Sequence, residues 1–464
     1  MQIPPEEMEI CLEVLQRIAD SSGTISRGQR FNSLISKIYR EGKRHDLRTE
    51  KNRRLTEDRA LLASTSMVKI QRDAVSPSSF LPPGESGEPV RTLNDPECCY
   101  VCKEDYYQVH FFYHLLCPKC AEFNYRMRHL SVDLKGRTAL VTGGRVKIGY
   151  QLVLKMLRDG AKVIVTTRFA NTAARRFHAE PDSAAWHDRL HIYPLDLMNI
   201  PAVESFAQHM LETESHLDII VNNAAQTVKR PHGFYRDLYA LEERPQDSLS
   251  IEARSLVHSQ STALAASDRS SLTRTSPAAM MNVMDVLPTD SLEDNEERAD
   301  SRDTNSWLLR LDEVTPVEML EVQLVNSVAP FMLNSLLKPL MMRSPFERRF
   351  IVNVSAMEGQ FRRHKTVFHP HTNMAKAALN MMSRTSGEDY AKDGIYMNSV
   401  DTGWVTDENP TPKRNRSQEE RAFFPPLDIV DGMARLYHPI ATGILSDEEP
   451  PFGHFLKDYA PAPW

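Results

Sequence analysis

Residues 137–149 read RTALVTGGRVKIG, and this stretch decides the fold. The apolar run from Arg137 to Thr142 predicts a buried strand that ends at a glycine pair. An apolar pattern at helical spacing then begins at Val146. A strand, a glycine turn and a helix start form the phosphate-binding corner of a dinucleotide-binding fold, because glycine lets backbone N–H groups approach a pyrophosphate. The residues expected around the cofactor phosphates are Thr142, Gly143, Gly144, Lys147, Ile148 and Gly149.

The bulk composition disfavours several classes of protein. The chain has 464 residues, enough for two or three domains, and its net charge of −6 disfavours a dedicated nucleic-acid binder. It holds no stretch of about 18 apolar residues, so we expect no membrane span. The N-terminus, MQIPPEEMEI, is acidic and lacks an apolar signal core. We therefore expect a protein that is not secreted and lies in the cytoplasm, with the nucleus as the alternative.

Changes of pattern along the chain predict four parts. Residues 1–75 carry apolar side chains at helical spacing and are expected to form a helical region. Residues 76–97 are rich in Pro, Gly and Ser and predict a linker. Residues 98–122 hold five of the six cysteines. Residues 134–464 predict one large domain, with an insertion at about 245–305 whose polar composition indicates disorder.

The clustered cysteines have the spacing of a metal site. Cys99-x-x-Cys102 and Cys117-x-x-Cys120 are separated by fourteen residues, and each pair can offer two thiolates to one tetrahedral ion. We expect a structural zinc site, with iron as the alternative metal and Cys98 as a substitute for Cys99. Because four thiolates leave no open coordination position, the site is expected to stabilise the fold rather than to catalyse.

From residue 134 onward the pattern alternates between strand and helix. This alternation predicts an α/β fold with a Rossmann-type, doubly wound parallel sheet. The helix that begins at Thr315-Pro316 has a cap residue, a first-turn proline and Glu318 as the partner in a capping box. The predicted strands are 137–142, 163–168, 190–196, 217–225, 348–355 and 394–400.

These motifs, in this order, resemble the short-chain dehydrogenase/reductase superfamily over residues 134–464. The resemblance implies a nicotinamide cofactor and oxidation or reduction of alcohols, ketones or activated double bonds. The matching pieces are DLKGRTALVTGG, the strand end at Asp196, VNNAA, VNSVAPF, VNVSA, AKAALN and NSVDTGWV.

The resemblance also implies roles for single residues. Asp196 is expected to hydrogen-bond the adenine edge, and Asn222 to anchor the cofactor and brace the neighbouring strand. Ser355 corresponds to the serine that binds the substrate carbonyl. Lys376 corresponds to the lysine that holds the ribose and lowers the pKa of the acid, and Asn326 to the asparagine of the proton relay.

The second predicted strand ends at Arg168 and lacks an acidic residue there. A carboxylate at this place would bind a ribose 2′-hydroxyl, whereas an arginine suits a 2′-phosphate. The sequence therefore favours NADP over NAD.

Two positions depart from the family pattern. Lys147 stands where the pattern has glycine; its ammonium could pair with a cofactor phosphate, or it could fill the phosphate space in a chain that no longer binds nucleotide. Thr372 stands where the acid/base tyrosine belongs, and the pKa of its hydroxyl is far too high for that role. His369 and His371 are candidate substitutes, although His371 lies about 100° around the helix from Thr372.

Two functions follow from this pattern. The first is an NADP-dependent oxidoreductase with an atypical proton donor and a small-molecule substrate. The second is a catalytically silent member of the fold that senses a nucleotide or serves as a scaffold for a protein partner. The sequence leaves the substrate and the oligomeric state open, including a homo-oligomer.

Overall fold

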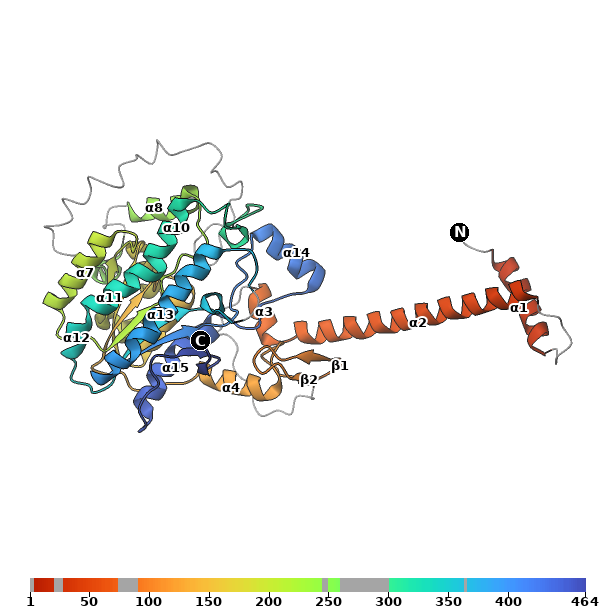
Figure 1. The fold of residues 1–464 in the computed structure, drawn as a ribbon, viewed down its shortest axis with the longest axis horizontal. Coiled ribbons are helices and arrows are strands. Elements are labelled where there is room, and N and C mark those ends of the chain that lie inside the picture. Colours follow the sequence, from red (N-terminus) through yellow and green to blue (C-terminus); the bar gives the residue numbers. More distant parts are fainter. Residues whose placement is uncertain (1–3, 21–27, 74–90, 244–248, 259–299, 363–364) are drawn as a thin grey trace. The chain divides into compact units, whose positions relative to one another are not determined.

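The computed structural model describes residues 4–20, 28–73, 91–243, 249–258, 300–362 and 365–464. The chain divides into two compact units (Figure 1), and each is described here by itself. The first unit comprises Met1–Ala60 and Leu93–Asp95. The second comprises Leu61–Thr92 and Pro96–Trp464.

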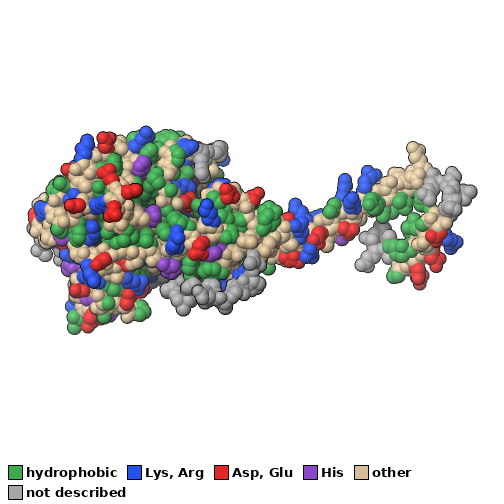
Figure 2. All heavy atoms as spheres, turned by 90° about the horizontal axis from the view of Figure 1, so that it is seen from below, with side chains coloured by type: hydrophobic (Ala, Val, Ile, Leu, Met, Phe, Trp, Pro, Cys, Tyr) green, Lys and Arg blue, Asp and Glu red, His purple; other side chains and the backbone are tan. Residues whose placement is uncertain are grey.

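The first unit is helical. It holds α1 (Pro5–Asp20) and all but the last turn of α2 (Gln29–Ala63), as the apolar spacing predicts. Figure 2 shows basic, acidic and apolar side chains interspersed along α2, of whose residues Asp58 is buried. The Asp58 carboxylate accepts hydrogen bonds from the backbone N–H groups of Asn94 and Asp95, which explains why this short segment belongs to the helical unit.

The second unit is built on an eight-stranded sheet with the order β10-β9-β8-β7-β6-β3-β4-β5. Seven strands pair in parallel, and β10 runs antiparallel to β9 at one edge. The central strands are fully buried apolar runs, which is why the sequence predicts them well. The strands are β3 (Thr138–Thr142), β4 (Lys162–Thr167), β5 (Leu190–Pro194), β6 (Ile219–Asn222), β7 (Arg349–Ser355), β8 (Ile395–Asp401), β9 (Phe455–Lys457) and β10 (Ala460–Ala462).

Helices cover both faces of this sheet (Figure 1). One apolar cluster joins the sheet to α5 and α15, and a second joins it to α7 and α11. The prediction of a doubly wound α/β fold is therefore confirmed. The helices of this unit are α3 (Ser66–Asp73), α4 (Pro118–Arg128), α5 (Lys147–Arg158), α6 (Ala170–His178), α7 (Ile200–Thr213), α8 (Arg236–Glu242), α9 (Ile251–Ser255), α10 (Pro316–Gln323), α11 (Ala329–Leu336), α12 (Lys338–Met342), α13 (Pro370–Lys392), α14 (Thr411–Arg421) and α15 (Ile429–Leu445).

Two predicted irregular segments are ordered where the structure describes them. Within the predicted insertion at 245–305, residues Ile251–Ser255 form α9 and Val257 forms a parallel bridge with Ile192 of β5. At its other end Asp300 is buried against two arginines. The expectation of disorder is wrong at these ends because both pack on the domain, and residues 259–299 lie outside the described part. The predicted linker likewise ends in a strand, β1 (Arg91–Cys98).

Candidate active site and metal centre

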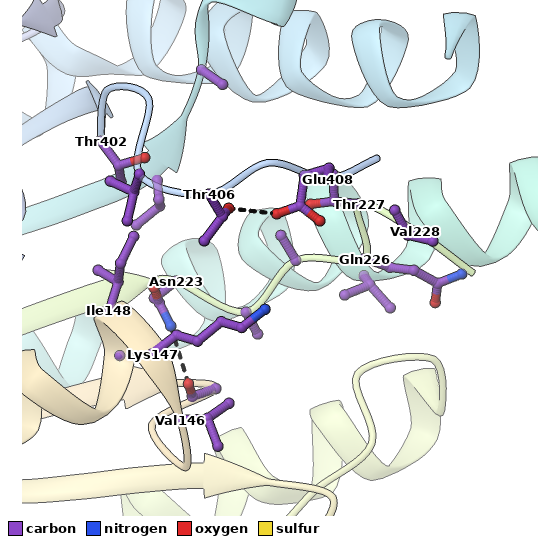
Figure 3. A pocket seen from close by; sticks show the side chains of 18 of the residues that line it. Val146, Lys147, Ile148, Asn223, Gln226, Thr227, Val228, Thr402, Thr406 and Glu408 are labelled. Atoms are coloured by element: carbon purple, nitrogen blue, oxygen red, sulfur yellow. Dashed lines mark hydrogen bonds between the residues drawn. The ribbon is translucent and has the colours of Figure 1, made fainter. Parts of the chain in front are cut away.

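The glycine turn after β3 packs tightly on the end of β6. Gly143 has a φ of +69°, and a Cβ atom there would lie 2.9 Å from Cα of Ala224. A Cβ on Gly149 would lie 2.4 Å from both Nδ2 of Asn223 and the carbonyl oxygen of Gly143. The Asn223 amide donates hydrogen bonds to the carbonyls of Thr142 and Gly143, at 3.0 and 3.1 Å (Figure 3). Both glycines are therefore required by close approach of the backbone, as the phosphate-binding motif predicts.

Lys147 has a left-handed backbone, the conformation that glycine adopts most easily. Its φ is +54°, in the left-handed region that costs a residue with a Cβ atom about 1–2 kcal/mol. Its side chain is exposed and extends along the cavity beside Asn223 (Figure 3). The turn thus combines a left-handed backbone at residue 147 with a cation at the cavity.

A cavity of 860 Å³ opens at the carboxyl ends of the strands. It spans the point where the strand order reverses, between β3 and β6, which is where doubly wound sheets bind ligands. The predicted site residues that line it are Gly143, Lys147, Ile148, Gly149, Arg168, Asp196, Ser355 and Lys376.

Two lining residues come from the predicted catalytic set. The Lys376 ammonium is almost fully buried and donates a hydrogen bond to the carbonyl of Val354 at 2.8 Å. Burial lowers the pKa of Lys376 to about 8, and the nearby carboxylate of Glu358 opposes this shift. The Ser355 hydroxyl donates to Oδ1 of Asn380 at 2.6 Å, so its proton is already engaged within the protein.

The two predicted asparagines brace the walls of the cavity and do not line it. Asn222 donates from Nδ2 to the side-chain oxygens of Asn334 and Asn353, both at 2.8 Å, which fixes it between β6 and β7. The expected bracing role of Asn222 is therefore observed, and its contact with a cofactor stays a prediction. Asn326 sits in a π-helical turn and clamps both backbone groups of Gln226, accepting from its N–H at 2.7 Å and donating to its carbonyl at 3.0 Å.

His369 and His371, the substitute acids considered from the sequence, do not line the cavity. Thr372 is buried, and neither it nor His371 belongs to the lining residues. His371 faces Glu318, with 3.5 Å between Nε2 and Oε1. Glu318 also accepts a hydrogen bond from the Ser306 hydroxyl, so its carboxylate is used here rather than in the predicted capping box. His369 stacks on Trp307 with ring centroids 3.9 Å apart.

Several lining residues carry no motif in the sequence. Glu358 follows β7, and burial raises the pKa of its carboxyl. Trp307 lies just after the predicted insertion, and Tyr100 and Lys103 belong to the cysteine-rich segment. Only the three-dimensional fold brings these residues to the cavity, and no local spacing rule indicates it.

Comparison with known proteins agrees with this geometry. The family model described as short chain dehydrogenase matches residues 137–269, which begin just before β3 and include the glycine turn. The chain belongs to the short-chain dehydrogenase/reductase superfamily. An uncharacterized protein of Acanthamoeba polyphaga mimivirus is 32% identical over 359 residues, covering 74% of this chain and 71% of that protein.

Named members of the superfamily match shorter stretches. Dehydrogenase/reductase SDR family member 13 of Homo sapiens is 34% identical over 93 residues, which cover 20% of this chain and 24% of the relative. Short chain dehydrogenase/reductase dpchH of Colletotrichum higginsianum is 37% identical over 110 residues, or 22% and 27% of the two chains. The match thus spans about a quarter of the length of these named relatives.

Solved structures of the superfamily are similar to this chain at low sequence identity and with TM-scores below 0.5. The NADPH-bound carbonyl reductase from chicken fatty liver is 18% identical, with a TM-score of 0.43 over 71% of this chain and 100% of that chain. The Pseudomonas aeruginosa RhlG/NADP complex gives 18% identity and a TM-score of 0.43 over 70% and 95%. Among the described residues, no helix combines the length and the hydropathy needed to cross a bilayer.

The four predicted cysteines form a compact group outside the superfamily fold. Their Sγ atoms all lie within 4.8 Å of one another, and those of Cys102 and Cys117 are 3.7 Å apart. Thiolates bound at about 2.3 Å around a tetrahedral zinc ion would be separated by about 3.8 Å. The group therefore fits a tetrahedral metal ion. Cys98 lies outside it and contacts the carbonyl of Lys103, so the alternative of Cys98 in place of Cys99 is not supported.

Local structure holds the thiols in place. β1 pairs antiparallel with β2 (Asp105–Val109), and the knuckle that carries Cys99 and Cys102 joins them. Cys117 lies just before α4, which carries Cys120. Burial would raise the pKa of the Cys99 thiol, but N–H groups from the backbone of the cluster outweigh this and lower it. Cys99 is thereby prepared to bind as a thiolate.

Proposed function

We propose that the chain is an NADP(H)-dependent oxidoreductase that acts on a carbonyl or an activated double bond of a small molecule. One observation carries the proposal: Ser355 and Lys376 line the same cavity as the glycine turn. A site that had lost its catalytic activity would not be expected to retain these groups in one cavity. Dehydrogenases and reductases among the named relatives support the reaction class, over about a quarter of their lengths.

The cavity residues fit a phosphorylated dinucleotide. The turn brings Gly143 and Gly149 so close to the chain at the end of β6 that a Cβ on either would clash. The helix α5 begins in this turn without a side-chain cap, and the N–H groups of a helix N-terminus suit a pyrophosphate. Lys147 and Arg168 add two cations to the same cavity, and both suit a 2′-phosphate better than a hydroxyl. The Arg168 guanidinium lies over the ring of Tyr235, 4.7 Å from its centroid. Asp196 lines the same cavity, and we propose that it binds the adenine edge.

A bound NADPH would supply the hydride. Lys376, with a pKa of about 8, takes up and releases a proton near neutral pH, and it is the group that we propose for proton delivery. Ser355 would orient the substrate oxygen once its hydroxyl turns away from Asn380. An enone or quinone could instead take its proton from water, since the cavity is open to solvent.

The test is a binding titration followed by turnover. Purified protein is titrated with NADPH and NADH by fluorescence, and NADPH oxidation is then followed over ketones, quinones and enones. We expect tighter binding of NADPH and loss of turnover in Lys376→Ala. Thr372→Val serves as the matched control on α13, because this buried hydroxyl has no hydrogen-bond partner in the described structure and does not line the cavity. Absence of binding to either nucleotide would overturn the cofactor assignment.

The second candidate is a silent member of the superfamily that binds a nucleotide without using it. Two observations favour it: the family tyrosine is absent, and the Ser355 proton is committed to Asn380. Tight binding of NADPH with no turnover over the whole substrate panel would select this function.

We also propose that the four cysteines bind one structural zinc ion. The support is the fit of the Sγ group to a tetrahedral ion. Metal analysis of the purified chain is expected to give about one zinc per chain, and about half a metal per chain or less would contradict the site. Iron instead of zinc would revise the metal and leave the site intact.

A further inference from the structure

The cysteine-rich segment contributes two side chains, Tyr100 and Lys103, to the wall of the cavity. Tyr100 lies between the ligand residues Cys99 and Cys102, and it lines the cavity that holds Ser355 and Lys376. The proposed oxidoreductase function uses neither Tyr100 nor the cysteine-rich segment that carries it. The contacts of Tyr100 join the four-cysteine cluster to the cavity.

The contact is a hydrogen bond to the turn that follows β8. The phenol oxygen of Tyr100 accepts a hydrogen bond from the backbone N–H of Trp404 at 2.9 Å. Thr402, Gly403 and Trp404 all line the cavity. Gly403 has a φ of +76°, and a Cβ atom on it would lie 3.5 Å from the Tyr100 oxygen, so the turn and the phenol are packed against each other.

Charged groups enclose the same phenol. Lys457 lies over the Tyr100 ring, 5.7 Å from its centroid, and donates a hydrogen bond to the carboxylate of Asp401 at 2.9 Å. Asp401 is the last residue of β8 and lines the cavity. Tyr100 therefore contacts the carboxyl end of a central strand rather than a remote surface.

The segment is anchored a second time, independently of the cysteines. Arg128 at the end of α4 donates hydrogen bonds to both oxygens of Asp428, at 2.6 and 3.0 Å, and pairs with Asp431 at 3.0 Å. The phenol of Tyr113 also donates to Asp431. These groups are buried, so the segment stays attached to α15 whether or not a metal is bound. Loss of the metal would therefore act on the ligand loops, including the knuckle that carries Tyr100, and leave the attachment to α15 intact.

We propose that the four-cysteine site acts on the cavity through Tyr100. A metal bound by the cysteines fixes the Cys99–Cys102 knuckle, the knuckle fixes the phenol, and the phenol holds the Thr402–Trp404 turn in the form that lines the cavity. Tyr100 is a positioning residue, and ligand binding in the cavity depends on the metal. This inference rests on the proposed zinc site and, for the choice of NADPH as the probe, on the proposed oxidoreductase function.

The experiment compares Tyr100→Phe with wild type and with protein stripped of metal by a chelator under reducing conditions. Tyr107→Phe is the matched control, because Tyr107 lies on β2 and is exposed. The readouts are metal content, the NADPH dissociation constant, and the hydrogen-exchange rate of the Trp404 amide.

Tyr100→Phe is expected to keep its metal, to bind NADPH roughly fivefold more weakly and to exchange the Trp404 amide roughly fivefold faster, the change expected for the loss of one hydrogen bond. Metal-stripped protein should change in the same direction by at least as much, and Tyr107→Phe should match wild type. An unchanged Trp404 amide in Tyr100→Phe would overturn the inference. If wild type binds no nucleotide, the proposed function fails, and the exchange rates still decide the coupling.

Discussion

Replacing Lys376 by methionine should stabilise the second unit at neutral pH. Burial lowers the pKa of Lys376 from 10.5 to about 8. Since one pKa unit corresponds to about 1.4 kcal/mol, the charged side chain costs about 3.5 kcal/mol below pH 8. Methionine loses the hydrogen bond from Nζ to the Val354 carbonyl, worth about 1 kcal/mol. The expected net gain in the free energy of unfolding at pH 7 is about 2.5 kcal/mol.

The sign of the pH dependence follows from the same shift. Between pH 8 and 10.5 the unfolded lysine keeps its proton while the folded one releases it. The unfolded state then binds more protons, so the stability of the wild type rises with pH across this window. Lys376→Met lacks this rise, and its advantage should vanish and then reverse by about 1 kcal/mol above pH 10.5.

Urea unfolding followed by far-ultraviolet circular dichroism at pH 7, 8, 9 and 10 measures this difference. Lys392→Met is the matched control, because Lys392 is an exposed lysine on the same helix, α13. It should change stability little and equally at every pH. A Lys376→Met protein that is less stable than wild type at pH 7, or a difference that does not depend on pH, would refute the assignment of a buried lysine with a lowered pKa.

Five further substitutions test other parts of the structure. Arg128→Met removes one partner of a buried ion-pair cluster and should lower the free energy of unfolding by about 3–5 kcal/mol in urea titrations. Gly149→Ala places a Cβ atom 2.4 Å from its neighbours and should weaken NADPH binding at least tenfold by fluorescence. Thr372→Val should leave NADPH binding and turnover unchanged, and a loss of turnover would restore this residue to the active site. Metal analysis should show zinc lost in Cys99→Ser and kept in Cys98→Ser.

The sheet and its binding corner are predictable because they depend on local sequence. A strand buried on both faces is a continuous apolar run, as in Thr138–Thr142, and the turn after it needs glycine for reasons of local geometry. The four cysteines are predictable for the same reason, since a knuckle has a fixed spacing.

The roles of single side chains depended on pairings that the sequence does not show. The Asn222 amide binds the side chains of Asn334 and Asn353, and that arrangement exists only once β6 and β7 pair. The orientation of His371 depends on where α13 begins and on the position of Glu318, more than fifty residues upstream. The position of Tyr100 depends on two hydrogen bonds, each between residues about three hundred positions apart in the chain. One joins Tyr100 to Trp404, and the other joins Tyr113 of the same segment to Asp431.

Lys147 carries a consequence for how this protein can change. Its left-handed backbone disfavours any residue with a Cβ atom, yet its ammonium is one of the cations of the cavity. A glycine there would relax the backbone and remove that cation in the same step. Fold stability and attraction for an anionic ligand are therefore opposed at this one residue, and neither can be improved there without a loss in the other.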